Sequence, residues 1–353
     1  MRKIVLTGGG TMGHISPNLA IIPKITSIFD EIHYIGSVNG PEKEKIEKLM
    51  RKYKNLNYHP ISSTKLNRGN ILKNFALPFI LIKSIFQAKK LLKQISPSVV
   101  FSKGGYVSVP VAISAGKLKK PLVIHESDLS MGLANKIASK RATTICTTFP
   151  SLAEKYKNGV ATGSPINPEI LTAEKSFAIN KYNLDPKKMT ITITGGSLGS
   201  TAINNAILKI LPSLTKKYNI IHLTGKGKKV DFHHPNYHQE EFTSSIGSVF
   251  KASDIIISRA GSNTIFEIAA LKIPMILVPL PKKSSRGDQI ENAEYFKKLK
   301  IAEVLDEQNL ENLESTLEKV VKNIIIYKKA LENQHFKNGL DAIIKEILKA
   351  EKR

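Results

Sequence analysis

The chain has 353 residues, which exceeds one ordinary domain and fits two α/β domains. Its 53 lysines and arginines against 29 acidic residues give a formal charge of +24, which favours an anionic partner such as nucleic acid, an anionic bilayer or a phosphorylated substrate. The basic residues are mostly scattered lysines and tryptophan is absent, so nucleic acid is the least favoured of these partners. A genome-wide bias toward lysine would produce the same charge.

Cysteine and hydropathy patterns bear on the compartment. Cys146 is the only cysteine, which excludes an intrachain disulfide and is compatible with a reducing compartment. The apolar run at 4–6 is too short for a signal-peptide core, and no apolar run approaches the roughly 20 residues that cross a bilayer. We therefore expect the protein to stay inside the cell.

The first predicted elements are a strand at 3–7, a glycine turn at 8–14 and a helix at 16–29 with Ser16 as its N-cap. His14 would lie at the N-terminus of this helix, where the helix dipole disfavours the charged imidazolium. A neutral imidazole can accept a proton from an attacking hydroxyl group. A histidine that only packs against the turn would have the same sequence position.

The same turn also fits a dinucleotide-binding fingerprint. Gly8, Gly10 and Gly13 satisfy G-x-G-x-x-G. That function requires an acidic residue at the end of the second strand to hold a ribose. The second predicted strand, at 32–35, is followed by Gly36 and a serine instead, so the fingerprint lacks its partner.

Residues 70–95 form the most membrane-like segment. Its apolar residues make a helical stripe wider than a core-facing helix needs, and they include Ile71, Phe75, Phe79, Ile82 and Phe86. Lysines surround the stripe at positions 73, 83, 89, 90 and 93. Pro78 is predicted to break the segment into two pieces. A buried core helix would show a similar stripe, whereas we expect partial insertion of an exposed part into a membrane interface.

Two further strands are predicted at 99–101 and 122–124. Glycines at 104 and 105 follow the first and allow a close approach of the backbone. The second ends in a polar run that contains Glu126 and Asp128. This run is either a satisfied cluster at a strand end or a contact surface for a substrate.

Residues 160–168 combine a glycine with two prolines and mark the expected domain boundary. Residues 190–200 then repeat the form of residues 3–13, with a strand, a glycine turn and a helix. Two such openings in one chain predict two Rossmann-like domains. In the second of them, the glycine turn would supply N–H and hydroxyl donors to a diphosphate.

The stretch from 254 to 292 predicts two successive strand-loop-helix units. Strands are expected at 254–258 and 274–279, a helix at 264–271, and another helix from Asp288. Both loops would then lie at the carboxyl edge of a parallel sheet, where open α/β sheets bind ligands.

This edge has groups that suit a sugar nucleotide. The turn at 261–264 offers backbone N–H groups to a phosphate, and Glu267, one turn further on, can accept hydrogen bonds from two ribose hydroxyls. Gln289 and Asn292, three residues apart on the next helix, share a face and can bind sugar hydroxyls. An ordinary βαβ unit with a buried glutamate would have the same pattern.

Several of these motifs together resemble those of the MurG family of glycosyltransferases, which have the GT-B architecture. The turn at 9–14 is similar to the family's G-G-T-G-G-H, the loop at 104–108 to G-G-Y-V-S, the run at 125–128 to H-E-Q-N, and the stretch 254–292 to the family's sugar-nucleotide signature. The chain departs from the family pattern at several positions, among them Met12 for a glycine, Asp128 for an asparagine, and Asn167 for the arginine of G-N-P-V-R.

The resemblance implies two doubly wound α/β domains that face each other across a cleft. Residues 1–162 would form the acceptor and membrane-facing domain, completed by a C-terminal helix at about 335–353, and residues 163–334 would bind UDP-GlcNAc. The implied reaction is inverting transfer of N-acetylglucosamine to the C4 hydroxyl of lipid I, giving lipid II, at the cytoplasmic face of the cell membrane. No cofactor is implied and, since no Asp-x-Asp motif is apparent, we expect no divalent metal.

The resemblance also implies roles for individual residues. The implied catalytic residues are His14 and Glu126, and the implied acceptor contacts are Tyr106 and Asp128. The implied donor-binding residues are Thr11, Gly13, Ser197, Thr243, Ser262, Asn263, Thr264, Glu267, Gln289 and Asn292. Another cation would replace the arginine at position 167, and the candidates are Lys226, Arg259, Lys282, Lys283 and Arg286.

Three other functions fit parts of the pattern. A non-hydrolysing UDP-GlcNAc 2-epimerase has the same architecture but does not need the lysine-ringed segment at 70–95. Another GT-B transferase, acting on a diacylglycerol or a small molecule, would differ at residues 100–135. A basic binding module without catalysis would release no UDP with any acceptor.

Overall fold

The computed structural model describes residues 1–64, 77–336 and 338–352. The chain forms two compact units, Met1–Asn167 with Asn338–Arg353, and Pro168–Lys337. The division lies within the 160–168 segment, a few residues after the expected boundary at 162.

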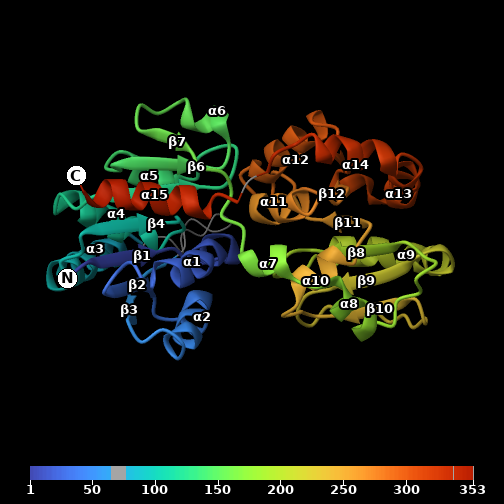
Figure 1. The fold of residues 1–353 in the computed structure, drawn as a ribbon, viewed down its shortest axis with the longest axis horizontal. Helices are drawn as coiled ribbons and strands as arrows, with labels where there is room; N and C mark the ends of the chain where they lie inside the picture. Colours follow the sequence, from blue (N-terminus) through green and yellow to red (C-terminus); the bar gives the residue numbers. More distant parts are fainter. Residues whose placement is uncertain (65–76, 337, 353) are drawn as a thin grey trace. The chain divides into compact units, whose positions relative to one another are not determined.

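The first unit is built on a seven-stranded sheet in which every described pair of neighbouring strands is parallel, in the order β3-β2-β1-β4-β5-β6-β7 (Figure 1). Its strands are β1 (Lys3–Thr7), β2 (Glu31–Ser37), β3 (Leu56–Ile61), β4 (Val99–Ser102), β5 (Leu122–Glu126), β6 (Thr144–Thr147) and β7 (Gly159–Ala161). Its helices are α1 (Met12–Ile25), α2 (Pro41–Met50), α3 (Leu77–Ile95), α4 (Ser108–Lys117), α5 (Leu133–Ser139), α6 (Pro150–Ala153) and α15 (Leu340–Glu351).

Strand β1 shows how the apolar pattern builds two cores in this unit. Ile4 and Leu6 pack in one cluster with residues of α1 and α15, whereas Val5 packs in another with residues of α3 and α4. All three side chains are fully buried, as expected of a parallel strand covered by helices on both faces. Helix α15 contributes Ile343 and Ile347 to the first cluster, so the end of the chain packs in the core of the first unit.

The second unit repeats the plan with a six-stranded parallel sheet in the order β10-β9-β8-β11-β12-β13 (Figure 1). Its strands are β8 (Thr190–Thr194), β9 (Asn219–Leu223), β10 (Tyr237–Glu240), β11 (Ile255–Ser258), β12 (Met275–Leu277) and β13 (Ala302–Val304). Its helices are α7 (Pro168–Thr172), α8 (Lys175–Lys181), α9 (Thr201–Lys217), α10 (Ile246–Lys251), α11 (Ser262–Ala270), α12 (Asp288–Lys298), the 3-10 helix η2 (Glu307–Asn312), α13 (Leu313–Lys322) and α14 (Ile324–Glu332).

The first helix begins one turn earlier than the sequence predicted. Helix α1 runs from Met12 to Ile25, and its N-cap is Thr11 in an extended conformation rather than Ser16. A serine followed by Pro17 is typical of a helix start, but this pair lies inside α1. The predicted position of His14 at a helix N-terminus is confirmed, since His14 is the third residue of α1.

The bounds of two other helices also differ from the prediction. Helix α11 begins at Ser262, two residues before the predicted start. Helix α15 begins at Leu340 rather than near 336, because Asn338 forms a parallel bridge with Ser164 and its side chain accepts a hydrogen bond from the Leu340 N–H. The predicted start of α12 at Asp288 is confirmed.

The order of the strands locates the ligand-binding edge of each sheet. In each unit the chain first builds strands to one side of the opening strand and then continues on the other side, so the order switches between β1 and β4 and between β8 and β11. Open α/β sheets bind ligands at the carboxyl ends of the strands beside such a switch point. In the part of the chain that the structure describes, no helix is both long enough and apolar enough to span a bilayer.

Candidate functional site

Two glycine loops of the first unit lie against each other at its switch point. Gly10 and Gly105 both have left-handed backbone conformations, with φ of 87° and 85°. A Cβ atom at Gly105 would lie 2.2 Å from the Gly9 carbonyl oxygen and 3.0 Å from Cδ2 of His14, and one at Gly10 would lie 2.4 Å from Cε1 of Tyr106. Only glycine permits this packing, which brings His14 and Tyr106 to the same edge of the sheet.

A buried carboxylate that the sequence reasoning missed supports the first of these loops. Glu42, in the first turn of α2, accepts hydrogen bonds from the Ser37 N–H at 2.9 Å, the Ser37 hydroxyl at 2.5 Å and the Gly10 N–H at 3.3 Å. A glutamate at a helix start just after the second strand was the available signal. Because protein groups fill its oxygens, Glu42 holds the loop and does not serve as the ribose-binding acid of a dinucleotide site.

Glu126 ends β5 and organises the loop that follows it. One carboxylate oxygen accepts from the N–H groups of Ser127 and Asp128, at 3.0 and 3.2 Å. The other accepts from the Gly132 N–H at 2.9 Å and the Asn135 side-chain amide at 3.0 Å. Four donors on a buried carboxylate favour a structural role over the catalytic role that the resemblance implies for this residue. Asp128 lies half-buried in the same loop.

A buried lysine connects the loops after β4 and β5 in the first unit. Lys103 precedes the glycine pair of the β4 loop, and its ammonium group donates to the Ser127 hydroxyl at 2.8 Å. Burial lowers the pKa of Lys103, and the nearby carboxylates of Glu126 and Asp128 oppose that shift. Sequence reasoning passed over this lysine because nothing in its local pattern predicts burial.

In the second unit, the loop after β8 forms a tight turn in front of α9. The Gly199 N–H donates to the Gly196 carbonyl at 2.9 Å, and the hydroxyl of Ser200, the N-cap of α9, accepts from the Ile203 N–H at 3.3 Å. Ser197 is exposed at the tip of this turn, as its predicted role in binding a diphosphate requires.

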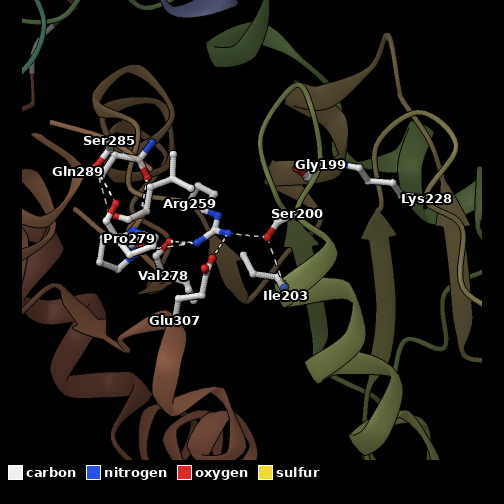
Figure 2. Close-up of polar contacts among 12 residues, drawn as sticks. Gly199, Ser200, Ile203, Lys228, Arg259, Val278, Pro279, Ser285, Gln289 and Glu307 are labelled. Carbon is white, nitrogen blue, oxygen red and sulfur yellow. Dashed lines mark hydrogen bonds and ion pairs between the residues drawn. The ribbon is translucent and has the colours of Figure 1, made fainter. Parts of the chain in front are cut away.

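The Arg259 side chain forms hydrogen bonds to several loops at the carboxyl edge of this sheet (Figure 2). This buried side chain, just after β11, donates to the Ser200 hydroxyl at 2.6 Å and to the carbonyls of Val278 and Pro279 at 3.3 and 3.4 Å. It also forms an ion pair with Glu307 in η2. These contacts link the loops after β8, β11 and β12, and they make Arg259 a poor candidate for the cation that contacts a phosphate.

The N-terminus of α11 has the geometry of an anion site. The Ile265 N–H donates to the Gly261 carbonyl at 3.1 Å, and the N–H groups of the first turn of a helix point out of its N-terminus. A Cβ atom at Gly261 would meet no heavy atom of the described chain within 4 Å, which shows open space in front of the helix. Backbone N–H groups and the helix dipole favour an anion there.

Glu267 lies one turn further along α11, in a desolvated position. Its carboxylate has no hydrogen-bond or ion-pair partner among the residues that the structure describes, and burial raises its pKa to about 7. Partial burial of a carboxylate without a protein partner costs free energy. Such a group suits a ligand that supplies hydroxyl donors.

The two residues predicted to bind sugar hydroxyls have different surroundings on α12. The Gln289 side-chain oxygen accepts from the Leu280 N–H at 3.0 Å, in the loop after β12 (Figure 2). Asn292 has no exposed surface, and its amide donates to the Ala260 carbonyl at 3.4 Å. Asn292 therefore connects α12 to the loop after β11, while Gln289 is the member of the pair that borders the loop at 280–287.

Three more predicted donor residues lie apart from this group. Thr11 and Gly13 are exposed in the first turn of α1, in the first unit. Thr243 follows β10 in the second unit, is buried, and its hydroxyl accepts from the Ser245 N–H at 3.2 Å. The structure thus places Ser197 and Glu267 at one edge of the second unit, and His14 and Tyr106 at one edge of the first.

Comparisons with known proteins identify the family. Residues 4–147 match the N-terminal domain of glycosyltransferase family 28, and residues 190–347 match its C-terminal domain. A UDP-N-acetylglucosamine--N-acetylmuramyl-(pentapeptide) pyrophosphoryl-undecaprenol N-acetylglucosamine transferase of Clostridium botulinum (strain Kyoto / Type A2) is 44% identical over 357 residues, covering 99% of each chain. The enzyme of the same name from Lachnospira eligens is 44% identical over 98% of each chain.

The chain belongs to the MurG family of glycosyltransferases. The crystal structure of Acinetobacter baumannii MurG matches with a TM-score of 0.74 at 24% identity, over 99% of this chain and 100% of that one. The predicted GT-B architecture of two parallel-sheet α/β domains is therefore confirmed.

Asn167 stands at the position where the MurG family pattern has an arginine. Asn167 is the last residue of the first unit before α7. Among the predicted replacements, Arg259 forms an ion pair with Glu307, and Arg286 Nε lies 3.6 Å from Asp288 Oδ1. The remaining candidates are exposed lysines on two loops of the second unit, namely Lys226, Lys282 and Lys283. Among the described residues, no cluster of three or more histidine, cysteine, aspartate or glutamate side chains could hold a metal ion.

Proposed function

We propose that the protein transfers N-acetylglucosamine from UDP-GlcNAc to the C4 hydroxyl of the muramyl sugar in lipid I, giving lipid II. Its relatives, 44% identical over nearly the whole chain, carry the name of this activity. The structural observation that carries the proposal is Glu267, a desolvated carboxylate without a protein partner among the described residues, one turn from the anion site at α11. Ribose hydroxyls beside a diphosphate fit this arrangement.

The chemistry is a single inverting displacement. The acceptor oxygen forms a bond to the anomeric carbon while the bond from that carbon to the diphosphate breaks, and UDP leaves with the electron pair. We assign the proton of the attacking hydroxyl to His14, whose ring packs beside Gly105. Negative charge on the departing diphosphate is stabilised by the Ser197 turn and by the N-terminus of α11.

The remaining residues of the first unit have supporting or acceptor-binding roles in this proposal. Tyr106 packs on Gly10 next to His14, so its ring lines the edge where the acceptor hydroxyl is expected. Asp128 lies in the loop after β5 and is assigned to acceptor contact. Glu126 and Lys103 hold that loop and the β4 loop in place.

The function is tested by measuring UDP release from UDP-GlcNAc with and without a short-chain lipid I analogue. We expect release only when the analogue is present. Conversion of the donor to UDP-ManNAc without acceptor would establish the epimerase activity instead. No turnover of either kind would leave a binding module and contradict the proposal.

We further propose that α3 docks the protein on the cytoplasmic face of an anionic membrane, where a lipid-linked acceptor would be found. Phe79 and Phe86 are 74% and 70% exposed, and they lie on α3 with the partly exposed Ile82. Lysines at 83, 90 and 93 on the same helix are exposed. Exposed aromatic side chains beside lysines suit the interface of an anionic bilayer. The predicted stripe residues Ile71 and Phe75 lie outside the described residues.

Replacing both Phe79 and Phe86 with serine is expected to lower binding to phosphatidylglycerol vesicles by about 100-fold or more, because burial of each phenyl ring contributes roughly 1.5–3 kcal/mol. Vesicle flotation measures the bound fraction. The matched control is Ile325→Ser with Ile326→Ser on α14, which are also exposed, at 78% and 60%. Equal losses for both double variants, or none for the phenylalanine pair, would contradict the assignment to α3.

Gly261→Ala is expected to leave the fold unchanged and weaken UDP binding by about tenfold. The backbone of Gly261, with φ −71° and ψ 127°, accommodates alanine, and the new methyl group would meet no described atom within 4 Å. That methyl group would project into the space in front of α11 that we assign to the diphosphate. Titration calorimetry with UDP and with uridine measures the effect, and an unchanged affinity for UDP would move the diphosphate elsewhere.

A further inference from the structure

Lys228, in the loop after β9, forms hydrogen bonds to backbone carbonyls of the glycine turn that precedes α9. Its ammonium group donates to the Leu198 carbonyl at 2.8 Å and to the Gly199 carbonyl at 3.2 Å. Figure 2 shows Lys228 next to Gly199, on the other side of the turn from Arg259. Neither its neighbours in sequence nor its residue type distinguishes it from the adjacent lysines at 226 and 229.

The lysine completes the bonding of one peptide group in this turn. The peptide between Leu198 and Gly199 has its N–H bonded to the Gly196 carbonyl at 2.9 Å and its carbonyl bonded to Lys228. At the exposed tip, the N–H groups of Ser197 and Leu198 have no acceptor among the residues that the structure describes. The turn therefore has bonded carbonyls on one side and available N–H donors at its tip, which is the arrangement of an anion-binding loop.

The backbone of Lys228 is itself anchored to the helix that follows the turn. The buried Asn204 of α9 donates from its amide to the carbonyls of Thr224 and Lys228, at 3.0 and 3.1 Å. The two loops also pack directly, because a Cβ atom at Gly199 would lie 2.1 Å from the Thr224 carbonyl oxygen. The fold therefore fixes the backbone from which the Lys228 side chain extends to the turn.

The charge of Lys228 is not neutralised by a neighbouring acid. Arg259, on the other side of the turn, is paired with Glu307. No carboxylate among the described residues forms an ion pair with Lys228. A net positive charge on the carbonyl side polarises the peptide groups of the turn and offsets the repulsion between their oxygens and an anion.

We propose that Lys228 is a positioning residue of the diphosphate subsite, holding the turn at 196–199 so that its N–H groups bind the leaving UDP. This inference rests on the proposed donor site in the second unit. Lys228 acts through the backbone of the turn and supplies positive charge on its carbonyl side.

The test compares Lys228→Met with Lys229→Met, since Lys229 is the next residue and is exposed. Titration calorimetry measures the affinity of each variant for UDP and for uridine, which lacks the diphosphate. We expect Lys228→Met to weaken UDP binding by about 10- to 30-fold, corresponding to a hydrogen-bonded charge, and to change uridine binding less than twofold. Lys229→Met should leave both affinities unchanged, and Lys228→Arg should recover part of the loss.

The possible outcomes separate this inference from the proposed function. Unchanged UDP affinity in Lys228→Met, or equal losses of UDP and uridine affinity, would overturn the inference while leaving the donor site intact. A wild-type protein that binds no UDP would overturn the proposed function and, with it, this subsite. The melting temperature of Lys228→Met is expected to stay near that of the Lys229→Met control, and a large drop together with equal ligand losses would assign the lysine to folding alone.

Discussion

Replacing His14 with alanine is expected to lower kcat for lipid I glycosylation by about 10²- to 10⁴-fold, the usual contribution of a positioned general base. The imidazole lies at the N-terminus of α1 and packs against Gly105, beside the ring of Tyr106. Removing it takes away the proton acceptor and changes no residue of the second unit. Steady-state UDP release with saturating acceptor analogue measures the change.

The controls for this variant separate chemistry from binding. UDP affinity is expected to stay within twofold of wild type, since the groups that we assign to the ribose and the diphosphate belong to the second unit. His233→Ala, at a histidine whose side chain is 90% exposed in the second unit, should leave kcat unchanged. A His14→Ala enzyme with the wild-type rate would remove this residue from the mechanism.

Glu267→Gln is expected to weaken UDP-GlcNAc binding by about 10- to 100-fold, because hydrogen bonds to an ionised group contribute roughly 1.5–3 kcal/mol. The wild-type affinity should itself depend on pH. Burial holds the pKa of Glu267 at about 7 in the free protein, and ribose hydroxyls would stabilise the ionised form. Donor binding then releases a proton, so the affinity falls as pH drops below 7.

Calorimetry with UDP-GlcNAc from pH 5.5 to 8 tests this dependence, since its esterified diphosphate does not titrate near pH 6 as a terminal phosphate does. The Glu267→Gln variant should show a flat profile. The control is Glu291→Gln, at an exposed glutamate of α12, which should keep the wild-type slope. A wild-type affinity that is independent of pH would contradict the contact between Glu267 and the ribose.

The same raised pKa makes a prediction about the stability of the free protein. Between pH 4.5 and about 7 the folded protein keeps a proton on Glu267 that the unfolded chain releases, so the free energy of unfolding falls as pH rises through this window. Above pH 7 the cost is fully present, at most about 3 kcal/mol. Glu267→Gln should therefore raise the melting temperature at pH 8 and leave it nearly unchanged at pH 4.5, as scanning calorimetry can measure.

The sheet was predictable from the sequence because parallel strands covered on both faces are continuous apolar runs. The runs at 3–7 and 190–194 each became the opening strand of a sheet, and the six strands of the second sheet have the order of the first six strands of the first. Helix starts were less predictable. The Ser16-Pro17 pair has the local chemistry of a start, but the preceding turn already bonds His14 N–H to the Thr11 carbonyl and begins α1 there.

The residues of the candidate site also differ in whether the sequence could single them out. Residues in a recognisable local setting, such as Glu267 after a strand-turn-helix, could be singled out from the sequence. The roles of Glu42, Lys103 and Lys228 could not, because each depends on a contact with a loop more than twenty residues away. Arg259 shows the converse, since its sequence position suggested a phosphate ligand while the fold pairs it with Glu307.

The most direct test of the donor site is a crystal structure of the protein with UDP-GlcNAc. The account predicts both ribose hydroxyls within hydrogen-bond distance of the Glu267 carboxylate, with the diphosphate between the N-terminus of α11 and the turn at 196–199. Uridine bound anywhere else, or a Glu267 carboxylate that still has no partner in the complex, would contradict it.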